Sequence, residues 1–402
     1  MRRGVLLIGN YPPPYGGVPR VIENLAAFLA EGGWSVHVVS GGRTGVERRG
    51  EITIHKLPLG AKLPLLARHA AHLRGGPIGI RVRSAHDMAI RTWYQVLASV
   101  GREVLLRHRI DVICGFNLSR GGLIGTVLGR ERGVPAVVNS FGELISDPAF
   151  FKANPSVLPF ICGTAARLVS GSRHCASTFA RFGLAPAVEV IPYGVDATRF
   201  EPTVSGSAMR DRLDARPSDV VVLFLGRHIP EMGLHTLLSA APNLLARDAA
   251  LRLVIAGASG ELSAAAHALA ARSGDRVRVL ENVPYAELPA LYAACDMLAA
   301  PTAGDRACSS LSAAEALATG RPVVAARVGG IPELVRDGEN GVLVPAEDVP
   351  ALTEAVLGLA KDPDGRRRLG EKGRAWIETE WDTRITLARM AAVLDETARA
   401  AA

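Results

Sequence analysis

Short apolar runs alternate with longer amphipathic stretches along most of the chain. The runs contain few polar residues, which is typical of parallel strands covered on both faces. In the first half they predict strands at 4–9, 35–39, 112–114, 136–139, 168–170 and 188–191. Between them, the spacing of apolar residues predicts helices, the clearest at 18–32, 121–132 and 172–182.

A second series of the same kind begins at residue 220. It predicts strands at 220–226, 252–256, 277–280, 297–300 and 323–325, with helices such as 233–246 in the gaps. Two such series predict an α/β protein with two doubly wound parallel sheets. The turn-forming segment IPYGVD at 191–196 separates them. We therefore expect domains at 1–193 and 194–375, followed by an amphipathic helix at 376–402.

Length and composition fit this organisation. The 402 residues suffice for two or three domains, and 48% hydrophobic with 21% charged residues is ordinary for a globular protein. The five cysteines are scattered and form no C-x-x-C pair, which favours reduced thiols, a cytoplasmic location and no structural zinc. No signal peptide or membrane-spanning run is expected, and no nucleic-acid partner.

The basic charge is concentrated in one segment. The chain carries a net charge of +7, and residues 61–110 contain nine Lys and Arg residues against two acids, so the rest is neutral overall. Three interpretations remain open: peripheral contact with an anionic lipid at the inner membrane face, a charged small molecule, or a solvated surface.

The segment 301–345 carries the strongest chemical signal. Ser309 and Ser310 precede a predicted helix at 311–319, so the helix start around Ser309–Leu311 offers N–H groups and a partial positive charge to a diphosphate. Glu315 lies inside that helix, where a carboxylate can accept hydrogen bonds from ribose hydroxyls. Arg227 follows the first strand of the second series, at an edge where ligand loops gather.

These motifs resemble one known family when they are taken in order. The segments PPPYGGVPRVIENL, VEVIPYGVDATRF, LFLGRHIPEMGLHTLL and NVPYAELPALYAACDMLAAPT, together with 301–345, are similar to the retaining nucleotide-sugar glycosyltransferases of family four. The resemblance implies the GT-B fold, with two Rossmann-like domains, the first binding acceptor and the second the nucleotide sugar. It also implies that the C-terminal helix at 376–402 crosses back onto the first domain.

The resemblance also implies the substrates and the donor-binding residues. We expect a nucleotide-sugar donor, a small-molecule or lipid-linked acceptor, retention of configuration, and no metal or other cofactor; no Asp-x-Asp metal motif is placed after a strand. The expected donor-binding residues are Gly16, Gly17, Arg227, His228, Ser309, Ser310, Leu311 and Glu315.

Three positions depart from the family pattern. The usual lysine of the second domain's opening loop is Met232, the first of two spaced glutamates is Ala307, and the His-Gly pair of the first domain begins with Phe141. Nearby carboxylates could replace the lost groups, so Glu143 and Asp305 join Arg227 as catalytic candidates.

Other functions remain as alternatives. An inert sugar-nucleotide-binding partner subunit of a transferase would share the whole pattern. A GT-B phosphorylase or epimerase is a weaker alternative, since the second-domain loops lack a lysine for pyridoxal phosphate. A dinucleotide oxidoreductase is disfavoured, because no G-x-G-x-x-G follows the first strand.

Overall fold

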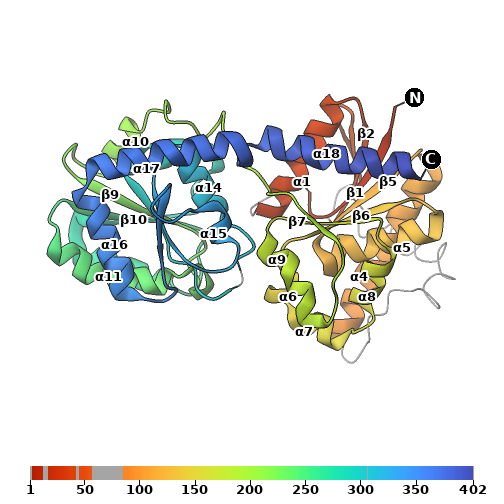
Figure 1. Ribbon diagram of the computed structural model, residues 1–402, viewed down its shortest axis with the longest axis horizontal. Helices are drawn as coiled ribbons and strands as arrows, with labels where there is room; N and C mark the ends of the chain where they lie inside the picture. Colours follow the sequence, from red (N-terminus) through yellow and green to blue (C-terminus); the bar gives the residue numbers. More distant parts are fainter. Residues whose placement is uncertain (1, 12–16, 42–44, 57–84, 306, 402) are drawn as a thin grey trace. The chain divides into compact units, whose positions relative to one another are not determined.

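The computed structural model describes residues 2–11, 17–41, 45–56, 85–305 and 307–401 (Figure 1). Its internal contacts divide the chain into two compact units. The first comprises Met1–Pro192 with Leu387–Ala402, and the second comprises Tyr193–Thr386.

The first unit is built on an eight-stranded sheet with the order β3-β4-β2-β1-β5-β6-β7-β8. Neighbouring strands are parallel except β3 and β4, which form an antiparallel pair. The strands are β1 (Gly4–Ile8), β2 (Ser35–Ser40), β3 (Val46–Arg49), β4 (Ile52–Lys56), β5 (Val112–Phe116), β6 (Ala136–Ser140), β7 (Arg167–Ser170) and β8 (Val188–Val190).

Helices cover both faces of this sheet (Figure 1). On one face, α1 (Gly17–Glu31) and α18 (Thr383–Ala400) pack on apolar side chains such as Leu7 and Val38. On the other face, α4 (Ala85–Arg107), α5 (Leu123–Arg132) and α8 (Val157–Thr164) pack on Leu6 and Ile113. The shorter elements are a π-helical turn at Asn117–Gly122, α6 (Glu143–Ser146), α7 (Pro148–Ala153), α9 (Arg173–Ser177) and a 3₁₀ turn at Thr178–Phe182.

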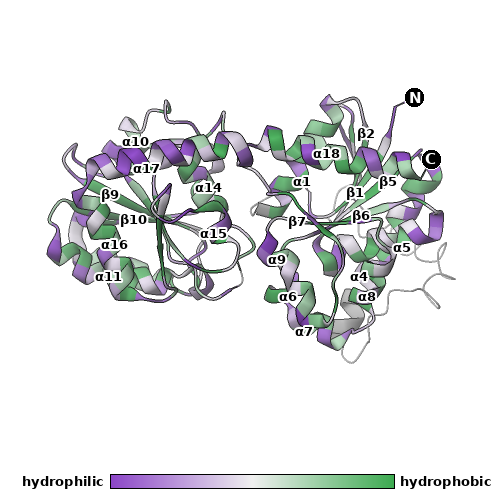
Figure 2. Cartoon of the chain, viewed as in Figure 1, coloured by the Kyte–Doolittle hydropathy of each residue, from purple (hydrophilic) through white to green (hydrophobic). Residues whose placement is uncertain are grey.

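The second unit holds a six-stranded, all-parallel sheet with the order β11-β10-β9-β12-β13-β14. Its strands are β9 (Val220–Leu225), β10 (Leu251–Gly257), β11 (Val277–Glu281), β12 (Met297–Ala300), β13 (Val323–Ala326) and β14 (Gly341–Val344). The strands of both sheets are mostly apolar, as Figure 2 shows, because each is covered on its two faces.

Helices again flank the second sheet. They are α10 (Ser207–Arg212), α11 (Leu234–Arg247), α12 (Ser263–Ser273), α13 (Leu288–Ala294), α14 (Leu311–Ala318), α15 (Ile331–Leu334), α16 (Val349–Lys361) and α17 (Pro363–Trp376). Short 3₁₀ turns lie at Pro230–Met232, Gly274–Arg276 and Tyr285–Glu287, and a π-helical turn lies at Ile377–Trp381.

The boundary between the two units lies further along the C-terminal helical segment than the sequence pattern predicted. We expected residues 376–402 to form one crossing helix, but Ile377 and Trp381 belong to the core of the second unit. Trp381 also accepts a backbone hydrogen bond from Val195 at 2.8 Å. The part that packs on the first unit begins at Leu387, and its apolar face reaches Leu394 and Ala398.

None of the helices in the described ranges has the length and apolar content needed to cross a membrane.

Candidate active site

The second sheet has a topological switch point between β9 and β12. From β9 the order runs outward to β10 and β11, whereas from β12 it runs the other way to β13 and β14. In open α/β sheets, ligands bind outside the carboxyl ends of the strands at such a point. The loops that leave β9 and β12 there are residues 226–233 and 301–310, and they contain half of the predicted donor-binding residues, namely Arg227, His228, Ser309 and Ser310.

The two loops are held against each other. Ala303 donates a backbone hydrogen bond to the Glu231 carbonyl at 3.2 Å. Gly233 has φ of +75°, and a side chain at this position would collide with the carbonyl oxygen of Pro301. Only glycine meets both conditions without strain, so Gly233 permits the close approach of the two loops.

Arg227 is the cation nearest to the switch point along the β9 loop. Its side chain is exposed, and the guanidinium forms neither a hydrogen bond nor an ion pair with any described residue. The backbone beneath it is fixed, because the Arg227 carbonyl accepts a hydrogen bond from Ile229 at 2.8 Å. Because its backbone is fixed and its guanidinium has no other partner among the described residues, Arg227 is well placed to bind an anionic ligand.

His228, the next residue, points inward instead. Its ring is fully buried, with Nδ1 3.0 Å from Ser263 Oγ and 3.7 Å from a carboxylate oxygen of Glu281. Burial lowers the pKa of His228, against an opposing effect of Glu281, so the ring is neutral at neutral pH. The structure therefore shows His228 anchoring the loop, while its contact with a donor stays a prediction.

The start of α14 presents backbone donors. Ser310 is the N-cap residue, and its hydroxyl accepts a hydrogen bond from the Ala313 N–H at 3.3 Å. The N–H groups of Leu311 and Ser312 donate to no other residue in the described ranges. Leu311 is 37% exposed, so this helix start is open to a ligand, and Ser309 precedes it directly.

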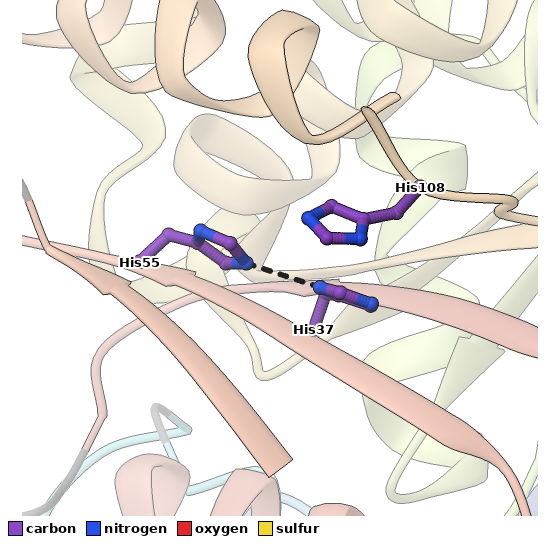
Figure 3. Close-up of side chains that lie close together, drawn as sticks. All are labelled: His37, His55 and His108. Carbon is purple, nitrogen blue, oxygen red and sulfur yellow. Dashed lines mark hydrogen bonds between the residues drawn. The ribbon is translucent and has the colours of Figure 1, made fainter. Parts of the chain in front are cut away.

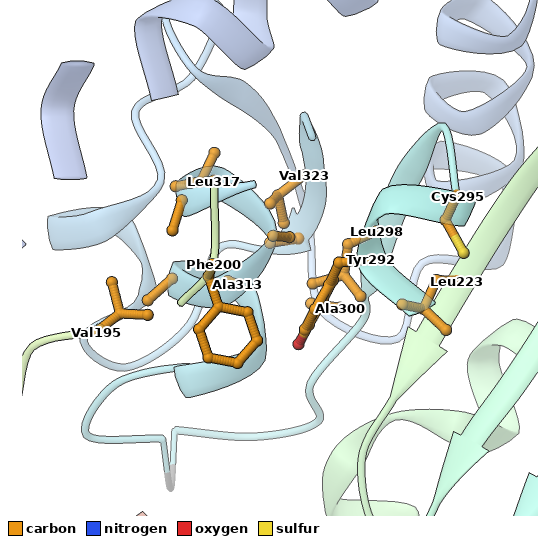
Figure 4. Close-up of a cluster of buried hydrophobic side chains, with 14 of the residues drawn as sticks. Val195, Phe200, Leu223, Tyr292, Cys295, Leu298, Ala300, Ala313, Leu317 and Val323 are labelled. Carbon is orange, nitrogen blue, oxygen red and sulfur yellow. The ribbon is translucent and has the colours of Figure 1, made fainter. Parts of the chain in front are cut away.

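Glu315 lies one turn further along α14 and is only 3% exposed. One of its oxygens accepts a hydrogen bond from the Tyr292 hydroxyl at 2.8 Å. Burial, and next the Glu315 charge, raise the pKa of Tyr292 well above its usual value, so Tyr292 remains a donor. Figure 4 shows Tyr292 beside Phe200, with Ala313 and Leu317 of α14 nearby. Sequence reasoning missed Tyr292, because no motif links α13 to Glu315.

The structure explains the residues found at two of the three positions that depart from the family pattern. Met232 packs against the apolar cluster beneath α11, so a position expected to carry charge is used for packing. The Ala307 carbonyl accepts a hydrogen bond from Gly330 at 2.9 Å, and a side chain at Gly329 would collide with that carbonyl. The loop is thus tied to the turn after β13 through its backbone. Asp305 is half-buried in the same loop.

In the first unit, the predicted candidate Glu143 lies at the carboxyl end of β6. Gly142 turns the chain with φ of +92°, and Glu143 then begins α6. The carboxyl group is 4% exposed and accepts hydrogen bonds from the Phe141 N–H at 3.0 Å and the Ser140 hydroxyl at 3.2 Å. Burial raises the pKa of Glu143 from 4.5 to about 7, despite these hydrogen bonds. Such a group can carry a proton at neutral pH.

The two glycines predicted to meet the donor phosphates follow β1. Gly17 is the first residue of α1. Gly16 lies outside the described residues, so its role stays a prediction.

Comparison with known proteins identifies the family. Residues 15–199 match the family described as Glycosyltransferase Family 4, and residues 219–362 match Glycosyl transferases group 1. The chain is 38% identical to the GDP-mannose-dependent alpha-(1-6)-phosphatidylinositol monomannoside mannosyltransferase of Mycolicibacterium smegmatis, across 97% of both proteins. The chain belongs to glycosyltransferase family four.

Further likenesses agree with this membership. The family-four chain is 32% identical to the D-inositol 3-phosphate glycosyltransferase of Salinispora tropica, across 88% of this chain and 79% of that protein. Its fold matches that of the sucrose-phosphate synthase of Thermosynechococcus elongatus, with a TM-score of 0.80. The match covers 99% of this chain and 100% of the synthase chain, and the two sequences are 20% identical. The GT-B fold and the family predicted from the sequence are thereby confirmed.

Proposed function

We propose that this family-four glycosyltransferase moves mannose from GDP-mannose to an inositol-containing phospholipid, with retention of configuration at the anomeric carbon. The observation that carries the proposal is the 38% identity to a mannosyltransferase named for that donor and that acceptor class, over nearly the full length of both proteins. The Salinispora relative is named for D-inositol 3-phosphate, which supports the inositol phosphate part of that acceptor.

The second unit supplies what the departing diphosphate requires. During transfer the bond between the anomeric carbon and the phosphate oxygen breaks, and negative charge grows on the diphosphate. Donors fixed in advance lower the energy of that charge more than water does. We assign this role to the Arg227 guanidinium and to the Leu311 and Ser312 N–H groups at the start of α14, which carries a partial positive charge.

Retention places the acceptor oxygen on the side from which the diphosphate leaves. The acceptor hydroxyl then forms its bond to the anomeric carbon while its proton passes to a phosphate oxygen, so no separate base is required. Glu143 and Asp305 are assigned to binding sugar or acceptor hydroxyls, since each is a carboxyl group near a position where the family pattern is lost.

Three of the four arginines in the described part of the basic segment form ion pairs with acidic residues. Arg102 is buried and forms a bidentate pair with Glu131 at 2.7 and 2.8 Å. Arg107 and Arg109 pair with Glu103 and Asp111, each at 2.9 Å. The other basic residues, apart from Arg91, lie in 57–84, outside the described residues, so peripheral membrane contact stays a prediction.

A donor and acceptor screen tests the proposal. The purified chain is incubated with GDP-mannose, GDP-glucose or UDP-glucose, with phosphatidylinositol mannoside micelles or without acceptor. We expect nucleoside diphosphate release that depends on both GDP-mannose and the lipid, and a product with the α configuration by NMR. Tight binding of GDP-mannose without transfer to any acceptor would favour the inert-subunit alternative, and inversion would contradict retention.

Glu315→Gln tests the contact with the nucleotide ribose. We expect weaker binding of free GDP as well as of GDP-mannose, on the order of tenfold each, because an amide is a poorer acceptor than a carboxylate for the ribose hydroxyls. Calorimetry of GDP binding measures this directly. Tyr292→Phe serves as the comparison, since it removes the hydrogen bond to Glu315 while keeping the charge. A change confined to sugar-dependent affinity would contradict the ribose assignment.

A further inference from the structure

Three histidines converge in the first unit, and none of them belongs to the site described above. His37 lies in β2, His55 lies in β4, and His108 follows the end of α4. One ring nitrogen from each lies within 4.8 Å of those of the other two. Nδ1 of His37 is 3.0 Å from Nε2 of His55, and the ring of His108 lies beside both (Figure 3).

Strand geometry places His37 and His55 on the same face. Val36, Val38 and Ile54 point into the core beneath α1, so the residues that alternate with them point toward the α4 side. In the parallel register His55 is paired with Val39, which lies two residues beyond His37. The two histidines are therefore diagonal neighbours on adjacent strands. His108 comes from the chain between α4 and β5, so three elements meet at the cluster.

The imidazoles are in the form that binds metal. His37 is 4% exposed and His55 is 9% exposed. Burial is the main reason that the pKa of each ring falls from 6.5 to about 4, so both keep a lone pair at neutral pH. Nε2 of His37 lies 3.3 Å from Ser35 Oγ, which would orient the ring by accepting its N–H.

We propose that His37, His55 and His108 form a binding site for a divalent transition-metal ion of the Zn²⁺ class. Two nitrogen ligands of a tetrahedral zinc ion, at bond lengths of about 2.0–2.1 Å, are separated by about 3.3 Å, close to the present spacing of His37 and His55. His108 is half-buried, which leaves access from solvent and a fourth position for water.

The charges around the cluster narrow the choice of ion. The cluster contains no carboxylate, and the pKa of His108 is lowered first by burial and then by the positive charges of Arg107 and Arg48. Ca²⁺ and Mg²⁺ depend on anionic oxygen ligands, so this environment disfavours them. Zn²⁺, Ni²⁺ and Cu²⁺ form strong bonds to neutral imidazole. The ion would join β2 and β4 to the segment before β5, which is a stabilising role.

Metal titration of the untagged 402-residue chain tests this site. After removal of metal with EDTA, the protein is titrated with ZnCl₂, and bound zinc is counted after dialysis. We expect one equivalent of zinc and a rise of several degrees in melting temperature, because the ion binds the folded state. Co²⁺ in place of Zn²⁺ should give the visible absorption of a tetrahedral nitrogen site.

Single substitutions test whether these three histidines, and not others in the chain, bind the zinc ion. His108→Ala, at the half-buried position, should weaken zinc binding at least tenfold and abolish the thermal shift, and His55→Gln should do the same. His174→Ala, on α9 of the same unit, should bind as the wild type does. Circular dichroism without metal confirms that each variant is folded. Equal zinc binding by wild type and His108→Ala, or less than one equivalent in the wild type, would overturn the proposal.

Discussion

Replacing Arg227 with alanine should lower turnover of the proposed donor, GDP-mannose, on the order of a hundredfold or more. The guanidinium is exposed at the carboxyl end of β9 and binds no described residue, so its charge is available to the diphosphate. Removal of one positioned donor from a charge-stabilising site costs about 2.7–4 kcal/mol in the transition state. Because negative charge grows as the bond breaks, kcat should fall more than the affinity for GDP-mannose.

A matched variant shows whether this effect belongs to the site. Arg272, near the end of α12, is also exposed and also binds no described residue, but it lies at the other end of its βα unit. Arg272→Ala should leave kcat and KM unchanged, and both variants should melt near the wild-type temperature. Near-normal turnover by a folded Arg227→Ala protein would exclude Arg227 from diphosphate binding and would leave the helix start of α14 as the remaining candidate.

The strand order explains why the switch-point residues could be inferred from sequence. In a parallel sheet every βα loop lies at the carboxyl edge, so an arginine just after the β9 run had to lie there. The loop before α14 had to lie there for the same reason. The local sequence pattern was sufficient to place these residues, because the strand, the loop and the helix follow one another directly in the chain. The hydrogen bond between Tyr292 and Glu315 joins different βα units, and nothing in either local sequence indicates it.

Elements without a clear apolar period were not predicted. The strand β3 has the sequence VERR and is half-exposed or exposed throughout, so it carries no core-facing pattern. The helix α4 was missed because charged and apolar residues are mixed along its 23 residues. Without β4 and α4, His55 and His108 could not be placed near His37. The expectation of no metal came from cysteine spacing and the lack of an Asp-x-Asp motif, neither of which reports on distant histidines.

The Met232 departure also depends on tertiary packing. The family resemblance indicated only that a charge was missing from the loop after β9. The structure shows that the side chain packs on the cluster beneath α11, which is a reason for methionine at this position. Within the described residues, Arg227 is therefore the positively charged side chain of this loop that can bind an anionic ligand. Because Met232 supplies no second charge, replacing Arg227 should lower turnover more strongly.

Glu143→Gln should remove a large pH dependence from the stability of the first unit. Burial raises the pKa of Glu143 from 4.5 to about 7, so the folded state holds this proton more tightly than the unfolded state does. Below pH 4.5 both states are protonated and the group has no effect. As the pH rises toward 7 the folded state loses stability, and above 7 the loss levels off at about 3 kcal/mol, at about 1.36 kcal/mol per pKa unit.

Comparison of wild type and variant isolates this contribution. The lowered pKa values of His37 and His55 act in the opposite direction, since they increase stability as the pH rises from about 4 to 6.5. They are present in both proteins and cancel in the difference. Urea denaturation in EDTA at several pH values from 4 to 8.5 should therefore show the variant gaining on the wild type as the pH rises, with the midpoint of the difference between 4.5 and 7. Parallel stability curves would mean that Glu143 is solvated and ionised in the folded protein, which would contradict the burial of its carboxyl group and the raised pKa.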